Sequence, residues 1–454
     1  MITGRHQILL VRAWIERYFP CPFERGGPVL VILGVSSAIL YLYTSTWNRD
    51  SFRHLPENMM ILTFFISAWG QRHQLKSDLI VRLMILSLLI PLCLFLVNLL
   101  IDYEAALKYR SLNDLLKLFM FLALAWWMGG SWKGARRMMI IAFLGLLTAI
   151  LLDPNLTQSL NRLLAGGRVD FNIHNAQHGA FLFGLVIIYS LCSLSLKSDE
   201  THSLRTNIVL FLACLIGVMG VLGTQTRATF IGLFACGFIG ILQWVRQSVF
   251  SRGRTSPVKI FFFLFFFAVL VVGTGTEIKD GRFASAKSQI QTLLEGSLEK
   301  LPVSGGVGIR VHSWAESLKW IAKRPIIGWG RGARSDVIKH AEHFPDEIKR
   351  LFGHLHNGYL ELLLGLGVIG LAFLGIFWAV LLKKIKLAAS EDLYAFALYG
   401  SIFLFVLNLF ESMFFYWSGV LGMSLFMAGG YSQYLAKNMA GAPRPAVGAT
   451  RLSE

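Results

Sequence analysis

Long apolar runs, separated by short polar stretches, constrain the fold of this chain more than any other feature. A helix needs ~20 mostly apolar residues to cross a bilayer core, and it must satisfy its backbone hydrogen bonds internally. Twelve runs approach this length, at residues 28–44, 57–71, 79–101, 114–129, 137–153, 177–196, 206–223, 227–245, 259–275, 358–382, 393–411 and 417–436. The sequence therefore predicts an all-α, polytopic membrane protein with about 12 transmembrane helices.

Composition agrees with a membrane protein and argues against other classes. Hydrophobic residues make up 55% of the chain and charged residues only 15%, whereas soluble domains have ~25% charged residues. The net charge of +17 could suggest nucleic acid, but basic residues at the ends of apolar spans are typical of membrane topology. We therefore expect membrane lipids, and no nucleic acid, as partners. The five cysteines have no metal-type spacing and predict no disulfide framework.

The distribution of basic residues predicts the orientation. With the N-terminus inside, the inner segments carry 21 Lys and Arg residues and the short outer loops carry 7, so both termini are expected in the cytoplasm. Residues 1–27 would be an amphipathic cytoplasmic lead-in, residues 28–275 the first nine helices, and residues 358–436 the last three. Residues 276–357 would be one large outer loop, partly helical around 311–323, and residues 437–454 a disordered cytoplasmic tail.

Four outer stretches concentrate polar chemistry. In GGRVDFNIHNAQHGA, His174 and His178 have the four-residue spacing of metal ligands on a helix, but no carboxylate accompanies them, so we predict no metal site. Helix capping by Asn175 is the preferred role there. Arg227 in GTQTRATF lies on the side that is poor in basic residues, which favours anion binding over snorkelling. The other two stretches are GIRVHSWAESLKWIAKRPIIGWGRG and HLHNGYLELLLGLGVIG.

The last two stretches also have simpler interpretations. A lone arginine such as Arg310 is most often a solvated loop charge, and nearby Arg331 and Arg334 complicate a single assignment. His356 alone would more often be an interfacial histidine than a catalyst. Glu411, at a span boundary, is the outer carboxylate left open as a nucleophile.

A resemblance to a known family changes this balance. HN, nine residues and then Gly367 and Gly370 resemble the His-Asn-x9-Gly-x-x-Gly pattern of the bacterial O-antigen ligases. RVHSWAESLKWIAKRPIIGWGRG is similar to the family's Arg-x3-Trp segment followed by Pro-x2-Gly-x-Gly, and TQTRAT resembles its Arg-containing turn between spans. The likeness covers about residues 160–430.

The resemblance implies a GT-C-like glycosyltransferase of the bacterial inner membrane whose active site faces the periplasm. Members transfer O-antigen from undecaprenyl diphosphate to a sugar hydroxyl of the lipid A core. Arg227 and Arg310 match arginines used for the diphosphate, and His356 matches the essential histidine, expected to be the general base. Arg168 matches less closely. Further substrate-binding candidates are Asn357, His312 and Arg331.

Such a reaction needs cations for the departing diphosphate and a base near ambient pH. The first outer loop has no Asp-x-Asp, so we predict metal-independent transfer with no cofactor. A single in-line displacement by the deprotonated hydroxyl would invert the anomeric carbon. Three alternatives stay open from the sequence: an O-antigen polymerase, a protein O-oligosaccharyltransferase, and a transporter of the lipid-linked glycan.

Overall fold

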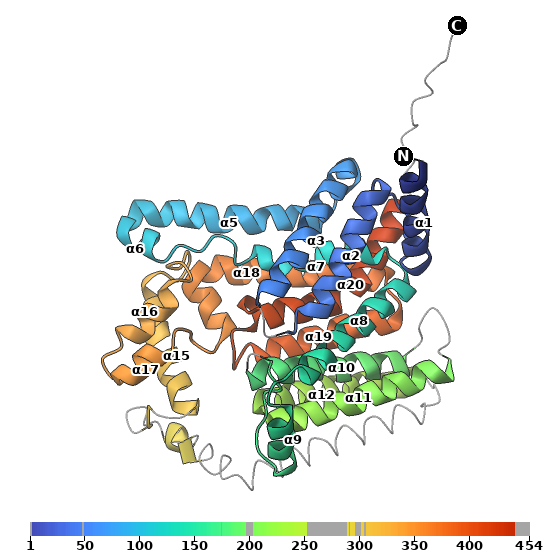
Figure 1. The fold of residues 1–454 in the computed structure, drawn as a ribbon. Helices are drawn as coiled ribbons and strands as arrows, with labels where there is room; N and C mark the ends of the chain where they lie inside the picture. The colour runs from blue at the N-terminus through green and yellow to red at the C-terminus, as the bar shows by residue number, and fades with distance from the viewer. Residues whose placement is uncertain are drawn as a thin grey trace.

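The computed structural model describes residues 2–47, 50–173, 175–196, 203–251, 288–289, 291–295, 301–303 and 306–440. This part of the chain folds as helices and connecting turns, without a β-strand among the described residues, as Figure 1 shows. The prediction of an all-α fold is confirmed. In chain order the helices are α1 (Ile2–Tyr18), α2 (Pro28–Thr44), α3 (Asp50–Gly70), α4 (Arg72–Leu75), α5 (Leu79–Ile101), α6 (Tyr103–Lys108), η1 (Leu116–Phe119), α7 (Met120–Met128), α8 (Trp132–Leu151), α9 (Leu156–Leu164), α10 (Ala176–Ser195), α11 (Leu204–Thr224), α12 (Arg227–Ser251), α15 (Gly306–Lys323), α16 (Ala333–Lys339), α17 (Asp346–Leu351), α18 (Gly358–Ala388), α19 (Glu391–Leu407), η3 (Met413–Phe415) and α20 (Trp417–Ala440).

The apolar runs predict these helices closely. The runs 28–44 and 79–101 have the same bounds as α2 and α5, and five described helices (α5, α8, α10, α11 and α18) are long and apolar enough to cross a membrane. The run 114–129 is instead the short pair η1 and α7, and the run 259–275 lies outside the described residues. The multi-pass membrane character holds, and the count of twelve spans stays a prediction.

Loops predicted to face the same side lie together. At one end, Lys384 Nζ contacts Asp78 Oδ2 at 3.3 Å, and the backbone N–H of Ser390 donates to Gln433 Oε1 at 2.8 Å. These residues come from two of the predicted inner loops and the end of α20. These contacts bring the two loops together at one end of the helix bundle, and the alternating order of inner and outer loops stays a prediction.

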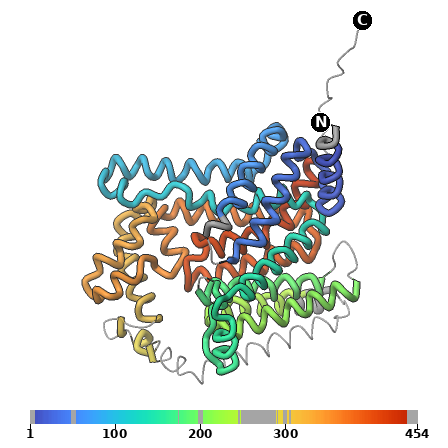
Figure 2. The backbone as a smooth tube through the Cα atoms, in the orientation of Figure 1, coloured from blue at the N-terminus to red at the C-terminus, as the bar shows by residue number. Residues whose placement is uncertain are grey.

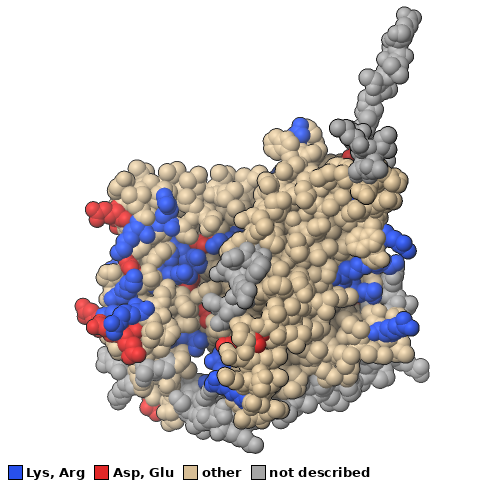
Figure 3. Space-filling model, viewed as in Figure 1, with Lys and Arg blue, Asp and Glu red and all other residues tan. Residues whose placement is uncertain are grey.

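The large predicted outer loop and the ends of three predicted spans meet at the opposite end. Arg331 Nε donates to Asp114 Oδ2 at 2.9 Å, and the backbone N–H of Gly358 donates to the carbonyl of Asn408 at 2.8 Å. Figure 3 shows Lys and Arg mixed with Asp and Glu at this end, Lys and Arg at the other end, and an uncharged band between them. Such a band is the surface expected of a chain embedded in lipid.

The helices α15, α16 and α17 form a small unit at the outer end, with its own hydrophobic cluster. This cluster includes Ile321, Val337, Phe344 and Leu355 and is separate from the large core among the membrane helices. The predicted helix at 311–323 lies within α15. The helices α10 and α11 run side by side (Figure 2), and α19 and α20 pack on α10.

A break in α18 joins the outer unit to the membrane helices. Gly367 has φ +62° inside the helix, and a Cβ there would lie 2.1 Å from the carbonyl oxygen of Ile326. The freed backbone groups pair with the segment 325–330, because Trp329 N donates to Leu364 O and Val368 N to Pro325 O. The glycine at position 367 thus permits the close approach of the 325–330 segment.

Candidate active site

His356 lies in the short turn that leads into α18. Its backbone has φ +50°, a left-handed conformation that is uncommon for residues other than glycine. The next residue, Asn357, caps the helix, since its Oδ1 accepts from the backbone N–H groups of Tyr359 and Leu360 at 3.1 Å each. The side chain of His356 is 14% exposed, so the turn fixes an imidazole at the mouth of the helix bundle.

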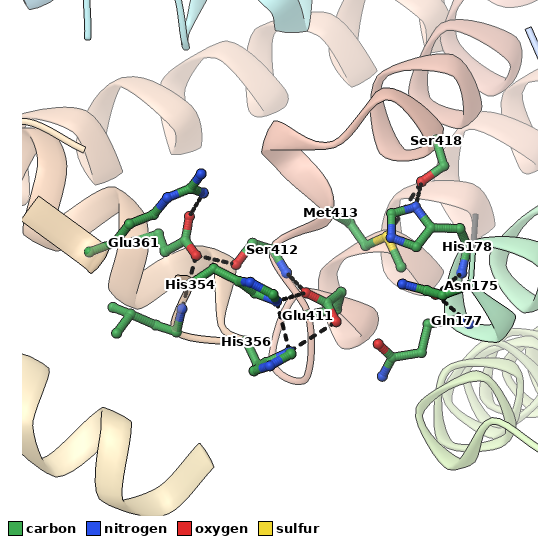
Figure 4. Close-up of polar contacts among 12 residues, drawn as sticks. Asn175, Gln177, His178, His354, His356, Glu361, Glu411, Ser412, Met413 and Ser418 are labelled. Carbon is green, nitrogen blue, oxygen red and sulfur yellow. Dashed lines mark hydrogen bonds and ion pairs between the residues drawn. The ribbon is translucent and has the colours of Figure 1, made fainter. Parts of the chain in front are cut away.

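A histidine pair and a carboxylate meet at this point (Figure 4). His356 Nδ1 lies 3.1 Å from Glu411 Oε2, and His354 Nε2 lies 3.3 Å from Glu411 Oε1. The two imidazole nitrogens are themselves 3.1 Å apart. Glu411 follows α19, so the turn before α18 and the turn after α19 together form the triangle.

The environment sets the charge state of this pair. Burial lowers the pKa of His356 below its ordinary 6.5, and Glu411 opposes this shift only in part. Burial alone would raise the pKa of Glu411, but hydrogen bonds from His354 and His356 lower it. Glu411 is therefore ionised and His356 neutral near pH 7. A neutral imidazole that donates its Nδ1–H to Glu411 keeps the Nε2 lone pair available as a base.

Gln177 connects this pair to an arginine. With its amide nitrogen donating to Glu411 Oε2 at 2.5 Å, its oxygen accepts from Arg310 Nη2 at 3.2 Å. Arg310 Nη1 donates to the carbonyl of Gly306 at 2.9 Å, while the buried Nε has no hydrogen-bond partner among the described residues. Arg310 thus keeps one buried donor unsatisfied next to the histidine pair, and such donors are rare unless a ligand uses them.

Two further arginines lie close to Arg310. The loop carrying Arg168 is bound to the turn before α12, because Arg168 Nε donates to the carbonyl of Thr224 at 3.1 Å. Arg227 is the first residue of α12. Burial lowers the pKa of Arg310, and after the opposing effect of Glu411 the charges of Arg168 and Arg227 lower it further. The structure therefore brings together three of the predicted arginines with His356.

A second ionic cluster, around Glu361, contacts the two turns that carry His356 and Glu411. The side chain of Glu361, in the first turn of α18, is fully buried and accepts from Arg334 Nη1 at 2.9 Å. Its Oε1 also accepts from the backbone N–H of Leu355 at 3.1 Å and from Ser412 Oγ at 2.7 Å. Leu355 precedes His356 and Ser412 follows Glu411. One carboxylate oxygen therefore holds both turns of the histidine–glutamate pair in register.

Replacing Glu361 tests this support. Glu361→Gln removes the charge that pairs with Arg334, and we expect a loss of unfolding free energy on the order of 2 kcal/mol. That is less than the ~3–5 kcal/mol of a fully buried pair, because Arg334 is 27% exposed. Thermal unfolding in detergent measures the loss. Glu347→Gln, on exposed α17, is the matched control, and equal midpoints for the two variants would contradict the support role.

The remaining predicted residues lie around this centre with other contacts. Arg331 pairs with Asp114 at 2.9 Å and lies 4.4 Å from the ring of Phe415. His312 is buried in α15, and its Nε2 lies 3.0 Å from the carbonyl of Leu301, so packing within the outer unit explains its position. Gly370 lies in α18 one turn beyond the break, where a Cβ would lie 2.5 Å from the side chain of Leu366.

The first polar stretch also has a clear arrangement. Asn175 caps α10 as expected, accepting from Gln177 N and His178 N. His178 Nδ1 contacts Ser418 Oγ at 2.6 Å and is buried, while His174 lies outside the described residues. Two residues of the site carried no assigned role in the sequence. Gln177 lies in the first polar stretch but was given no role, and Glu411 was left open only as a nucleophile.

This arrangement can perform two kinds of chemistry at one place. A neutral imidazole oriented by a carboxylate can remove a proton from a hydroxyl group. Three guanidinium groups with a buried unsatisfied donor can bind a di-anion and stabilise charge that develops on it. Both groups lie at the end of the helix bundle that carries α15, α16 and α17.

Comparison with known proteins agrees with the motifs. A family model described as O-antigen ligase matches residues 212–375. These residues include Arg227, Arg310, His356 and both motif glycines, whereas Arg168 and Glu411 lie beyond them. No curated protein matches the chain. The resemblance is thus confirmed for this region, where residues 212–375 are similar to the O-antigen ligase family.

Proposed function

We propose that this protein is an O-antigen ligase of the bacterial inner membrane. It transfers O-antigen from undecaprenyl diphosphate to a sugar hydroxyl of the lipid A core on the periplasmic side, without a metal ion or cofactor. The family match supports ligase- or polymerase-type activity in general. The acceptor and the roles of single residues are our proposal.

In the proposed reaction, Nε2 of His356 takes the proton of the acceptor hydroxyl. The acceptor oxygen forms a bond to the anomeric carbon while the bond from that carbon to the diphosphate oxygen breaks. Undecaprenyl diphosphate leaves with the bonding electrons, and Arg310, Arg227 and Arg168 stabilise its negative charge. A single in-line displacement of this kind inverts the anomeric centre.

One observation carries the proposal: an oriented base and an unsatisfied guanidinium share a single bridging amide. Gln177 contacts both Glu411, which orients His356, and Arg310, whose Nε is buried without a partner. A group that accepts from Arg310 Nε would therefore lie beside the imidazole. Proton removal and leaving-group stabilisation need this proximity, because the two events belong to one displacement.

Restoration of lipopolysaccharide in a ligase-null host tests the acceptor. We expect the gene to restore long-chain lipopolysaccharide on gels, with O-antigen supplied by the host. A polymerase would lengthen lipid-linked glycan without attaching it to lipid A core, and a protein O-oligosaccharyltransferase would modify protein. If lipid A core stays bare while the protein is present in the membrane, the ligase proposal is wrong.

The pH dependence tests the base. Because burial lowers the pKa of His356 below 6.5, the imidazole stays neutral until the pH falls below that value. The acidic limb of kcat/KM should therefore lie below pH 6.5 and report one proton. Glu411→Gln removes a carboxylate that raises this pKa, so its limb should move to still lower pH. A wild-type limb above pH 6.5 would contradict the assignment.

A further inference from the structure

The triangle of His354, His356 and Glu411 has the dimensions of a metal-binding site. The facing nitrogens, His354 Nε2 and His356 Nδ1, are 3.1 Å apart; His356 Nδ1 lies 3.1 Å from Glu411 Oε2, and His354 Nε2 lies 3.3 Å from Glu411 Oε1. One ligand atom from each of the three residues lies within 4.8 Å of the other two. Zinc–ligand bonds of ~2.0–2.1 Å in a tetrahedron place neighbouring ligand atoms about 3.3–3.4 Å apart. Small side-chain shifts would therefore make this triangle one face of a zinc tetrahedron.

Hydrogen bonding alone does not satisfy the triangle well. If both imidazole nitrogens carry protons, they both donate to Glu411 and two donors face each other at 3.1 Å. If only one carries a proton, that proton is shared between the other imidazole and the carboxylate. A cation at the centre accepts a lone pair from all three atoms at once. A bound metal ion would therefore satisfy the three side chains better than hydrogen bonds among them do.

We propose that His354, His356 and Glu411 form a reversible binding site for a divalent transition-metal ion of the zinc type, and that this ion inhibits the enzyme. Two imidazoles and one carboxylate with an open fourth position are a common ligand set for zinc. The three residues lie at the outer end of the bundle, with His354 24% exposed, so an ion in the surrounding solution can reach them.

Inhibition follows from the chemistry of imidazole, and this step rests on the proposed function. A metal ion on Nδ1 of His356 uses the lone pair at that nitrogen, so the remaining ring proton must lie on Nε2. Nε2 then has no lone pair with which to take a proton from the acceptor. The same ion also removes Glu411 from its hydrogen bond to His356.

The neighbouring charges make the site weak enough to be reversible. The carboxylate of Glu411 would bind the ion, and the guanidinium of Arg310 lies nearby, separated from Glu411 by the side chain of Gln177. Asp and Glu ligands favour the cation, whereas the guanidinium repels it. The transfer reaction itself needs no metal, so EDTA should leave activity intact and reverse inhibition by added Zn²⁺.

Cobalt spectroscopy on the purified full-length protein tests binding without any need for activity. Co²⁺ should give the strong visible bands of a tetrahedral site, and Zn²⁺ should abolish them. His354→Gln removes one ligand and should weaken Co²⁺ binding by more than the roughly 10–100-fold that loss of an outer-shell contact costs. His343→Gln, an exposed histidine of the outer unit, is the control and should bind as the wild type does.

A ligation assay then tests inhibition. Zn²⁺ should inhibit the wild type and the His343→Gln control by the same factor, while the activity that His354→Gln shows without metal should be inhibited far less by added Zn²⁺. Absence of tetrahedral Co²⁺ bands in the wild type, or unchanged bands in His354→Gln, would overturn the site. If the protein binds Co²⁺ at this site but has no ligase activity, the metal-site proposal holds. The proposed function, and the inhibition that rests on it, would then be wrong.

Discussion

His356→Ala is expected to abolish transfer, with a fall in kcat of roughly 10²–10⁴-fold, the usual contribution of a positioned acid or base. The variant removes the imidazole and leaves Arg310 and Gln177 in place, so binding of the lipid-linked donor should change little. The fall should therefore appear in kcat more than in KM. A ligation assay with purified donor and lipid A core, together with gel analysis of lipopolysaccharide in a ligase-null host, measures both effects.

Controls separate chemistry from folding in this experiment. His343→Ala removes an exposed histidine of the same outer unit and should keep wild-type activity. Circular dichroism of His356→Ala should match that of the wild type, and its thermal midpoint measures the cost of losing the contact with the buried Glu411. If His356→Ala protein, present in the membrane at normal levels, still attaches O-antigen to lipid A core, His356 is not the base.

Hydropathy predicted the membrane helices because lipid imposes a length and a composition on each span. The run 79–101 has the bounds of α5, and the run 358–382 begins where α18 begins. Hydropathy carries no information about backbone angles, however. The break at Gly367 depends on a φ of +62° and on backbone pairing with 325–330, contacts that no local pattern contains.

Site residues could be predicted where their type and their side of the membrane identify them. They could not be predicted where their role depends on tertiary contacts. Arg310 and His356 stood out as outer residues with a resemblance to a family motif. Glu411 is 55 positions from His356, and neither the apolar pattern nor the motif indicates that their turns meet. His312 shows the opposite case, because it lies in the motif segment but contacts the Leu301 carbonyl within the outer unit.

Arg310→Lys should cost about 10²–10³-fold in kcat/KM even though the charge is kept, similar to the loss of one preorganised donor in other enzymes. A guanidinium presents its donors in a planar fork, whereas an ammonium is a point charge on a flexible stem. In this protein the fork contacts the Gly306 carbonyl and Gln177 and keeps Nε buried without a partner. A lysine ammonium cannot direct hydrogen bonds to the Gly306 carbonyl, to Gln177 and to a ligand at the position of Nε at the same time.

Stability distinguishes this role from a structural one. A buried donor without a partner costs folding free energy, so Arg310→Lys should leave the thermal midpoint unchanged or raise it while activity falls. Arg350→Lys, on exposed α17, should change neither quantity. A parallel fall in activity and midpoint would indicate that Arg310 only holds α15 in place. Near-wild-type kcat/KM would instead show that the diphosphate does not depend on the Arg310 fork, and the charge would then have to be carried by Arg168 and Arg227.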